Sequence, residues 1–314
     1  MKAAQFKTYG DPQVVEVVDV EKPAIQDGQI LVEVHAASLN PFDYKVRRGY
    51  MKEMIPLALP VTLGGDFAGT ITAVGNGVSE FAVGDEVFGQ ANVVGGGSGT
   101  LAEFAAAKAG SVAKKPQSVD FFQAAALPLV GVSAVQALIE HIKLVKDQKI
   151  LIHGGAGGIG SIAIQLAKSI GAYVATTASP DHADFVRSLG ADEVIDYKGQ
   201  DFSTILKDFD AVYDTVGGET YTKSFAVLKK GGVIVTMVAK PDPELDKKYE
   251  VTTIGQMTNT TTERLTHLAE LVDAEKIKVT IEKMFPLEQA KEAYDFLETN
   301  HPKGKIVVTL KATT

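Results

Sequence analysis

Hydrophobic residues in the first third of the chain recur at the short, alternating spacing of β-strands. Alternation covers residues 14–20 and 70–74, and a more continuous apolar segment covers 30–34. A period of two is the period of side chains along a strand, and the Gly and Pro residues between these segments mark turns. The pattern predicts a mostly β domain with irregular loops over residues 1–120.

From residue 121 the hydrophobic spacing switches between helix and strand. Strands are predicted at 150–152, 173–177, 193–195, 211–213 and 232–236, with helical segments between them. This alternation is typical of a doubly wound parallel sheet, an α/β fold, which we place at 121–261.

Two further helical segments, 265–272 and 287–297, precede a last predicted strand at 305–310. That strand has no place in a completed α/β sheet. We therefore expect it to return to the N-terminal β domain, so that residues 262–314 complete the domain formed by 1–120.

A glycine-rich turn follows the strand at 150–152, and its residues are Gly155, Ala156, Gly157, Gly158, Ile159 and Gly160. In G-x-G-x-x-G the first glycine allows a tight turn, the second lets backbone approach a diphosphate, and the third brings the helix close to its strand. N–H groups at the start of the helix then bind the anionic oxygens. We expect a dinucleotide here, with a purely structural glycine turn as the alternative. No Gly-Lys-Ser/Thr follows, so a P-loop is not supported.

Composition narrows the function classes. The net charge of −8, without a cluster of Lys and Arg, argues against nucleic acid as a partner. The chain has no cysteine, which excludes disulfides, thiolate catalysis and thiolate zinc ligands and fits a reducing compartment. Residues 1–6 lack an apolar secretory core, and the apolar stretch 124–139 is too short to span a membrane. We expect a cytoplasmic enzyme with no membrane insertion.

Several short motifs occur in order along the chain. They are ASLNPFD at 37–43, GDFAG at 65–69, FAVGDEV at 81–87, AALP at 125–128, the segment 152–167, and LGADEVIDY at 189–197. Together they resemble the medium-chain dehydrogenase/reductase superfamily, in its zinc-independent quinone oxidoreductase branch. The C-terminal segment LETNH at 297–301, followed by Gly304-Lys305, is most similar to the plant alkenal and enone reductases of that branch.

The resemblance implies a Rossmann domain plus a GroES-like mostly β domain, with the active site between them. It implies transfer of a hydride from NADPH to a quinone or an α,β-unsaturated carbonyl, and a homodimer. Zinc alcohol dehydrogenases share this architecture, but the positions matching their ligands hold Asn40 and Gly65-Asp66, and their four-cysteine lobe has no counterpart. We expect catalysis without zinc or another metal.

A carbonyl oxygen that gains negative charge during reduction needs a hydrogen-bond donor. Lys45 is the first candidate, because the plant reductases that this chain resembles carry a lysine there. The alternative is a solvated lysine in the basic run Lys45, Arg47 and Arg48, since charge runs are usually surface.

Three more residues near Lys45 are candidates for the substrate site. Asn40 is expected to contact the substrate or the nicotinamide ribose, or else to cap a loop before Pro41. Tyr44 and Tyr50 are expected to line the pocket, with packing as the alternative. Segments 47–60 and 241–255 are interpreted as loops that shape this pocket.

The choice of cofactor depends on the end of the second α/β strand. It reads Ala178-Ser179, small and neutral, where an NAD enzyme places an acidic residue. In the resembling reductases a lysine and a tyrosine hold the 2′-phosphate, and this chain has His182 and Tyr197 there. Asp181 is a rival ribose ligand, so NADPH is preferred to NADH but NADH stays open.

By resemblance, Ser133 is expected near the nicotinamide, with a helix-turn serine as the alternative. Val216 and Val238 complete the predicted cofactor-binding set. Two other function classes also remain open. One is a nucleotide-binding protein of the same fold with a structural or regulatory role and little turnover. The other is a saturated-alcohol dehydrogenase, which would lack a Lewis acid.

Overall fold

A computed structural model describes residues 1–311, so the predicted residues 312–314 of the first domain lie outside the described part. The chain forms two compact units. The first comprises Met1–Leu129, Thr260–Asp273 and Val279–Thr314, and the second comprises Val130–Asn259 and Ala274–Lys278. These units differ from the predicted limits mainly at helix α2 (Phe121–Ala125), which was predicted in the second domain and belongs to the first unit. There the centre of the Phe121 ring lies 4.0 Å from the centre of the His35 ring. The division into a substrate-binding domain and a dinucleotide-binding domain at the predicted limits stays a prediction.

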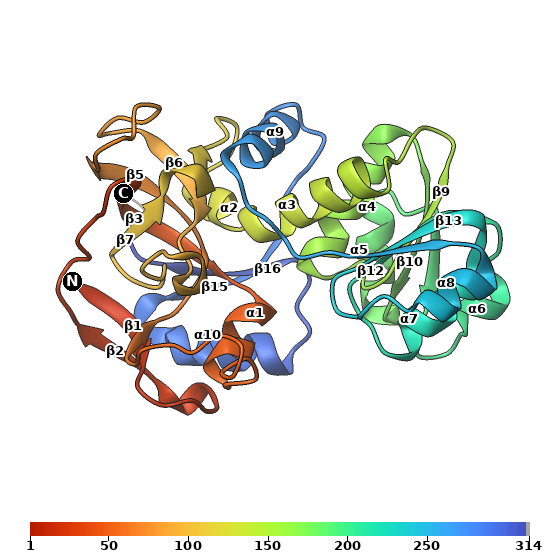
Figure 1. Ribbon diagram of the computed structural model, residues 1–314, viewed down its shortest axis with the longest axis horizontal. Helices are drawn as coiled ribbons and strands as arrows, with labels where there is room; N and C mark the ends of the chain where they lie inside the picture. The colour runs from red at the N-terminus through yellow and green to blue at the C-terminus, as the bar shows by residue number, and fades with distance from the viewer. Residues whose placement is uncertain (312–314) are drawn as a thin grey trace. The chain divides into compact units, whose positions relative to one another are not determined.

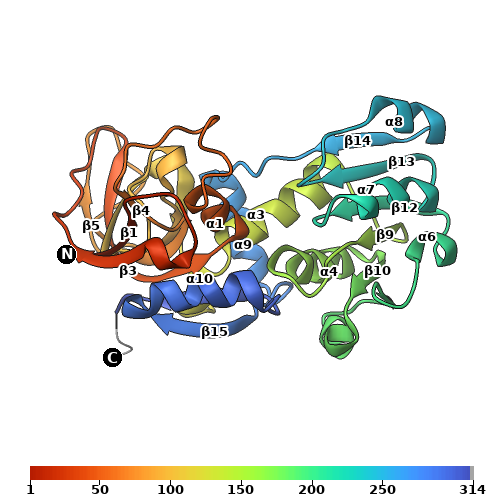
Figure 2. The same cartoon turned by 90° about the horizontal axis from the view of Figure 1, so that it is seen from below.

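The second unit is built on one six-stranded sheet in which every pairing is parallel. Its strands are β9 (Lys149–Ile152), β10 (Tyr173–Ala178), β11 (Glu193–Asp196), β12 (Phe209–Asp214), β13 (Leu228–Thr236) and β14 (Thr252–Gly255). They lie side by side in the order β11-β10-β9-β12-β13-β14, of which Figure 2 labels the strands from β10 to β14. This is the 3-2-1-4-5-6 order of the dinucleotide-binding fold, and it confirms the predicted doubly wound sheet.

Helices connect these strands. They are α4 (Gly158–Ile170), α5 (Ala183–Ser188), α6 (Phe202–Ile205), α7 (Glu219–Ser224) and α8 (Pro243–Tyr249). Helix α4 buries Ile162 and Leu166, which confirms the predicted helical spacing. It ends at Gly171, whose φ of 93° is the left-handed conformation that glycine adopts readily at a helix C-terminus.

The first unit holds two sheets, one of three strands and one of seven. The strands are β1 (Lys2–Phe6), β2 (Val15–Asp19), β3 (Gln29–Leu39), β4 (Val61–Thr62), β5 (Asp66–Val74), β6 (Glu86–Gln90), β7 (Phe104–Lys108), β8 (Val112–Lys114), β15 (Ile281–Pro286) and β16 (Lys305–Thr309). One sheet has the order β2-β1-β4, and the other has β15-β16-β3-β5-β6-β8 with β7 also on β3. Strand β16 pairs antiparallel with β3, which confirms that the last strand returns to the N-terminal sheet.

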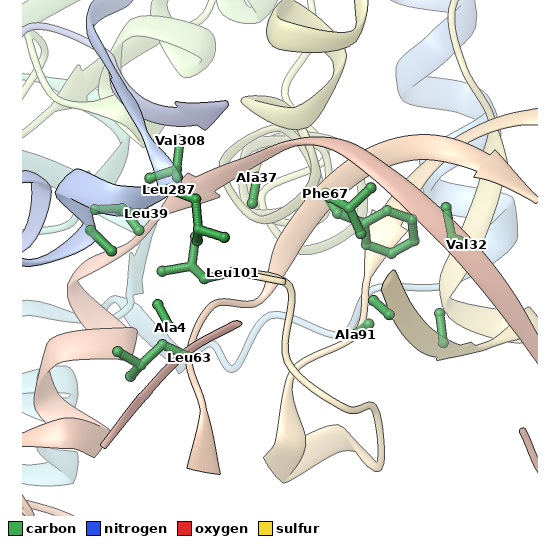
Figure 3. Close-up of a cluster of buried hydrophobic side chains, with 14 of the residues drawn as sticks. Ala4, Val32, Ala37, Leu39, Leu63, Phe67, Ala91, Leu101, Leu287 and Val308 are labelled. Carbon is green, nitrogen blue, oxygen red and sulfur yellow. The ribbon is translucent and has the colours of Figure 1, made fainter. Parts of the chain in front are cut away.

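The apolar core of this unit draws residues from many elements, with the long strand β3 supplying five of them. Phe67, Leu39 and Val308 point into a buried cluster together with Leu101 from a loop (Figure 3). Besides α2, helices that border the sheets are α1 (Pro41–Arg47), α9 (Thr262–Asp273) and α10 (Ala290–Thr299). Helix α10 lies beside α1 (Figures 1 and 2). Helix α3 (Pro128–Val135) carries the chain from the first unit into the second, where it continues as a π-helical segment, Gln136–His141.

The interpretation of 241–255 as a loop is wrong. The segment forms α8 and the edge strand β14. Helix α8 has the sequence PELDKKY and fully buries no residue. Leu245 and Tyr249, four residues apart, pack partly buried against the core, and an apolar stripe of two residues is too short to predict a helix. Its start is instead encoded by Asp242, whose carboxylate accepts the backbone N–H groups of Glu244 and Leu245.

Candidate functional site

The predicted cofactor residues gather at one edge of the second unit. All six strands are parallel, so their carboxyl ends meet at the same edge of the sheet. Residues 155–160 follow β9, Ser179 follows β10, and Tyr197 follows β11. Val216 and Val238 follow β12 and β13 and are about half exposed. In doubly wound folds ligands bind at this edge.

At two positions of the glycine turn, close packing leaves no room for a side chain. A Cβ on Gly155 would lie 2.1 Å from Oγ1 of Thr176, and one on Gly160 would lie 2.2 Å from the carbonyl oxygen of Gly154. Glycine at 160 therefore lets the start of the helix lie close to the turn at Gly154 and Gly155, and its predicted part in cofactor binding stays a prediction. The left-handed residue of the turn is Gly154, with φ +70°, so the tight turn predicted for Gly155 belongs to its neighbour.

Gly157 is different, because neither its backbone nor its packing demands glycine. Its φ is −73°, and a Cβ at this position would lie 3.5 Å from its nearest neighbour, the carbonyl oxygen of Gly154, which is an ordinary contact. Gly157 also offers no side-chain cap to the 13-residue helix α4, and the first N–H groups of a helix have no partner within the helix. Open space over backbone at the positive end of a helix fits a diphosphate.

A cavity of about 380 Å³ lies where β10 and β11 end. Ser179 lines it, together with Gln200 and Asp196, and Arg187 of α5 supplies a positive charge that the sequence reasoning missed. Arg187 contacts Asp184 at 3.2 Å, but both side chains are more than half exposed, and such pairs hold their partners weakly. The predicted residues His182 and Tyr197 are not among the described residues that line the cavity, but each is a close sequence neighbour of residues that do.

Ser133 is fully buried in α3, inside the second unit. Its hydroxyl lies 2.6 Å from the hydroxyl of Thr258, and its carbonyl oxygen accepts hydrogen bonds from Tyr213 and Gln256. These contacts fix the position of α3 beside the sheet. The proposed contact of Ser133 with the nicotinamide stays a prediction.

The four predicted catalytic residues belong to the first unit and surround α1. Asn40 precedes the helix, Tyr44 and Lys45 lie within it, and Tyr50 follows it. Tyr44 packs against the apolar core and burial raises its pKa, whereas Tyr50 is 68% exposed. Lys45 is half-buried, and within residues 1–311 no hydrogen bond or ion pair engages its ammonium group.

The two arginines after Lys45 are not a solvated run. Arg47 is fully buried and pairs with Glu298 of α10. Arg48 donates to the same carboxylate at 2.7 Å through Nε. The alternative interpretation of this basic run as surface is therefore wrong for Arg47, because α10 covers it.

Asn40 is buried in a polar cluster that sequence reasoning did not assemble. Its Nδ2 donates to Oδ2 of Asp66 at 2.8 Å, and its Oδ1 accepts from Nζ of Lys305. Lys305 also donates to the carbonyl of Leu39 at 2.7 Å and lies 3.7 Å from Asp66. Burial lowers the pKa of Lys305, and Asp66 opposes that shift. Asp66 and Lys305 both lie in motifs that carry the family resemblance, and those motifs were the only sequence feature that could have marked them as site residues.

The contacts of Asn40 and Asp66 show whether these side chains could bind zinc. The two side chains at positions matching zinc ligands, Asn40 and Asp66, are both engaged by the ammonium of Lys305, which repels a cation. Within residues 1–311 no group of three His, Cys, Asp or Glu side chains is arranged to hold a metal. The donor set therefore does not fit zinc, and catalysis without metal stays a prediction.

A 3-2-1-4-5-6 parallel sheet, a glycine turn open above a helix N-terminus and a separate β unit define a dinucleotide-binding oxidoreductase fold. Residues 26–117 match the alcohol dehydrogenase GroES-like domain, and residues 189–308 match the zinc-binding dehydrogenase family. The chain belongs to the medium-chain dehydrogenase/reductase superfamily, in its quinone oxidoreductase branch, as its motifs predicted.

Relatives agree along the whole chain. The NADPH-dependent alkenal/one oxidoreductase, chloroplastic, of Arabidopsis thaliana is 35% identical over 98% of this chain and 79% of its own length. The quinone oxidoreductase of Coxiella burnetii is 36% identical, with a TM-score of 0.92 over 99% of both chains. The quinone oxidoreductase of Escherichia coli, solved with NADPH, is 27% identical, with a TM-score of 0.89 over 99% of this chain and 100% of that one.

Proposed function

We propose that this protein is an oxidoreductase that transfers a hydride from NADPH to a quinone or an α,β-unsaturated carbonyl. The observation that carries the proposal is the open backbone at Gly157 before the uncapped helix α4. The names of the Arabidopsis, Coxiella and Escherichia relatives support the substrate classes and the cofactor.

NADPH, when bound, supplies the hydride, and the chain supplies position and charge. We propose that Lys45 donates a hydrogen bond to the carbonyl oxygen as negative charge develops there. Its neighbours Arg47 and Arg48 are held by Glu298, so Lys45 is the cation of α1 that remains available to a ligand. Asn40, Tyr44 and Tyr50 stay candidates for contacts with the substrate.

The preference for NADPH over NADH is supported by the cavity beside Ser179. A neutral residue after β10 leaves room for a 2′-phosphate, and Arg187 places a guanidinium in the same cavity, whose lining also holds the carboxylates of Asp184 and Asp196. We propose that Arg187 contributes to phosphate binding together with His182 and Tyr197. An R187Q variant should raise KM for NADPH several-fold and leave KM for NADH unchanged.

The decisive experiment follows NADPH oxidation with a panel of quinones and enones. A G157A variant places a methyl group where the diphosphate would lie, while the protein itself leaves room for it. We expect G157A to fold and to lose NADPH affinity by tenfold or more. G110A is the matched control, since a Cβ at Gly110 meets nothing within 4 Å.

Four outcomes separate the alternatives. NADPH binding with turnover supports the proposal. Binding without oxidation by any quinone or enone would favour a nucleotide-binding protein with a structural or regulatory role. Unchanged affinity in G157A would overturn the placement of the cofactor. Activity removed by a chelator and restored by zinc would contradict metal-independent catalysis.

Location and assembly stay predictions. The Arabidopsis relative is chloroplastic, so a cytoplasmic location for this chain is not confirmed. No helix within residues 1–311 is both long and apolar enough to cross a membrane. We propose a homodimer, which sedimentation of the purified protein would test.

A further inference from the structure

His153 is a fully buried histidine between β9 and the glycine turn. Its backbone N–H donates to the carbonyl of Tyr213 on β12, at 3.0 Å. Its imidazole lies between two hydroxyl groups, with Nδ1 at 3.2 Å from Oγ1 of Thr177 and Nε2 at 2.9 Å from Oγ of Ser224. The ring of Phe202 packs on it at 4.6 Å between ring centres.

The hydrogens of this cluster can be assigned by counting donors. The single hydroxyl hydrogen of Ser224 goes to the carbonyl of Thr220 at 2.7 Å, so Ser224 Oγ accepts from His153 and Nε2 carries the hydrogen. Nδ1 is then an acceptor and receives the hydroxyl hydrogen of Thr177. The imidazole is therefore neutral, and burial lowers the pKa of His153 to about 4, with Asp214 of β12 as the charged group that opposes the shift.

The chain of hydrogen bonds ends on the glycine turn. Because the Thr177 hydroxyl donates to His153, its oxygen is oriented to accept the backbone N–H of Gly154, at 3.1 Å. The carbonyl of Thr177 accepts the next N–H, that of Gly155, also at 3.1 Å. Gly154 is the left-handed residue of the turn, so these two bonds fix where the backbone reverses toward Gly157.

We propose that His153 and Thr177 are positioning residues for the cofactor, which hold the glycine turn in its diphosphate-binding shape through the chain Ser224–His153–Thr177–Gly154. The inference rests on the proposed function, because it assumes that the turn binds NADPH. Neither residue touches the cofactor. Loss of the chain lets the Gly154 N–H find another arrangement, and the turn samples shapes that bind a diphosphate less well.

Matched variants separate the two ends of the imidazole. In H153N the side-chain amide oxygen takes the place of Nδ1, so the hydrogen bond from Thr177 is kept. In H153Q the side-chain amide nitrogen takes the place of Nε2, so the bond to Ser224 is kept and the bond from Thr177 is lost. T177V removes the hydroxyl at constant shape, and T177S restores it. T204V, at an exposed threonine of α6, is the control.

We expect T177V and H153Q to weaken NADPH binding by roughly tenfold, the effect of one lost hydrogen bond. H153N and T177S should recover most of that affinity. KM for NADPH should rise in T177V and H153Q while kcat and KM for the quinone change less than twofold. Equal affinity in T177V and wild type, with both folded by circular dichroism, would overturn the inference.

A second measurement is independent of turnover. Amide hydrogen exchange at Gly154 should be faster in T177V and H153Q than in wild type, T177S or T204V. If the wild type fails to bind NADPH, the proposed function fails, yet the exchange data still report on the hydrogen-bond chain. If NADPH binds and exchange at Gly154 is unchanged in T177V, only this inference fails.

Discussion

Asp214 and Thr236 join the ends of two neighbouring strands, with the Thr236 hydroxyl donating to the Asp214 carboxylate at 2.9 Å. The other carboxylate oxygen accepts the backbone N–H groups of Val216 and Gly217. Thr236 Oγ1 in turn accepts the N–H of Ala239 at 3.1 Å. One buried pair therefore holds the loops that carry Val216 and Val238, two of the predicted cofactor residues, although no periodic signal in the sequence marks it.

Removal of the Thr236 hydroxyl should loosen both loops. We expect T236V to lower the free energy of unfolding by about 1–3 kcal/mol, because Asp214 loses a donor and Ala239 an acceptor in a buried site. NADPH affinity should fall as well. Urea unfolding and a binding titration measure the two effects, and T236S should reverse both. A T236V protein as stable as wild type would contradict this account.

Asp43 introduces a dependence of stability on pH. It is buried at the third position of α1, where its carboxylate accepts the backbone N–H of Asn40 at 2.8 Å. Burial is the main cause that raises its pKa to about 7 from 3.8. Between these pH values the folded protein keeps a proton that the unfolded chain has lost, so this contribution to stability is full below pH 4 and disappears as pH rises through 7.

The D43N variant should therefore gain stability over wild type as pH rises. We expect D43N to be relatively more stable at pH 8 than at pH 5, by a few kcal/mol, since one pKa unit is about 1.4 kcal/mol. Urea unfolding at both pH values measures the difference. E53Q, at a glutamate whose side chain is 90% exposed, is the control and should show no such trend. A D43N difference that does not vary with pH would refute the assignment.

The Arg47–Glu298 pair anchors α1 to α10. The Arg47 side chain is fully buried and that of Glu298 is 8% exposed. Removing one partner leaves an uncompensated buried charge, so E298A should cost about 3–5 kcal/mol of unfolding free energy. E16Q breaks the exposed Lys7–Glu16 pair and should cost less than about 1 kcal/mol. The double variant R47M/E298M should recover much of the loss, and failure to recover it would mean that packing, not charge, dominates.

Sequence predicted the elements whose start and stop are encoded locally. Helix α4 has an apolar stripe and a glycine at each end, so its limits and its contact with β9 follow from a single segment. Strand β16 could be assigned to the N-terminal sheet because an α/β sheet had no further position for it. Helix α8 and edge strand β14 were missed because their apolar patterns are short, with only Leu245 and Tyr249 packed on the core from α8 and four residues, TTIG, in β14.

Polar clusters were less predictable because they join distant residues. Asn40 meets Asp66 across 26 residues and Lys305 across 265 residues. No local pattern links such positions, and only the tertiary pairing of β3, β5 and β16 brings them together. The motifs marked each residue as characteristic of the family, but the contacts among them needed the structure. His153 and Arg187 likewise carry no signal beyond their proximity to the glycine turn and to β11.

Lys45 is the sharpest test of the catalytic proposal. Stabilising charge on a carbonyl oxygen through one donor is worth about 100-fold or more in rate, so K45A should lower kcat for enone or quinone reduction by about that factor. K45R keeps a donor and should retain part of the activity. NADPH affinity should not change in either variant, because the predicted cofactor residues belong to the other unit. K7A is the control, at a lysine of the same unit outside the predicted pocket, whose side chain is 63% exposed. If kcat in K45A equals that of wild type, the donor to the carbonyl oxygen is another residue, and Tyr50, 68% exposed beyond the end of α1, becomes the next to replace.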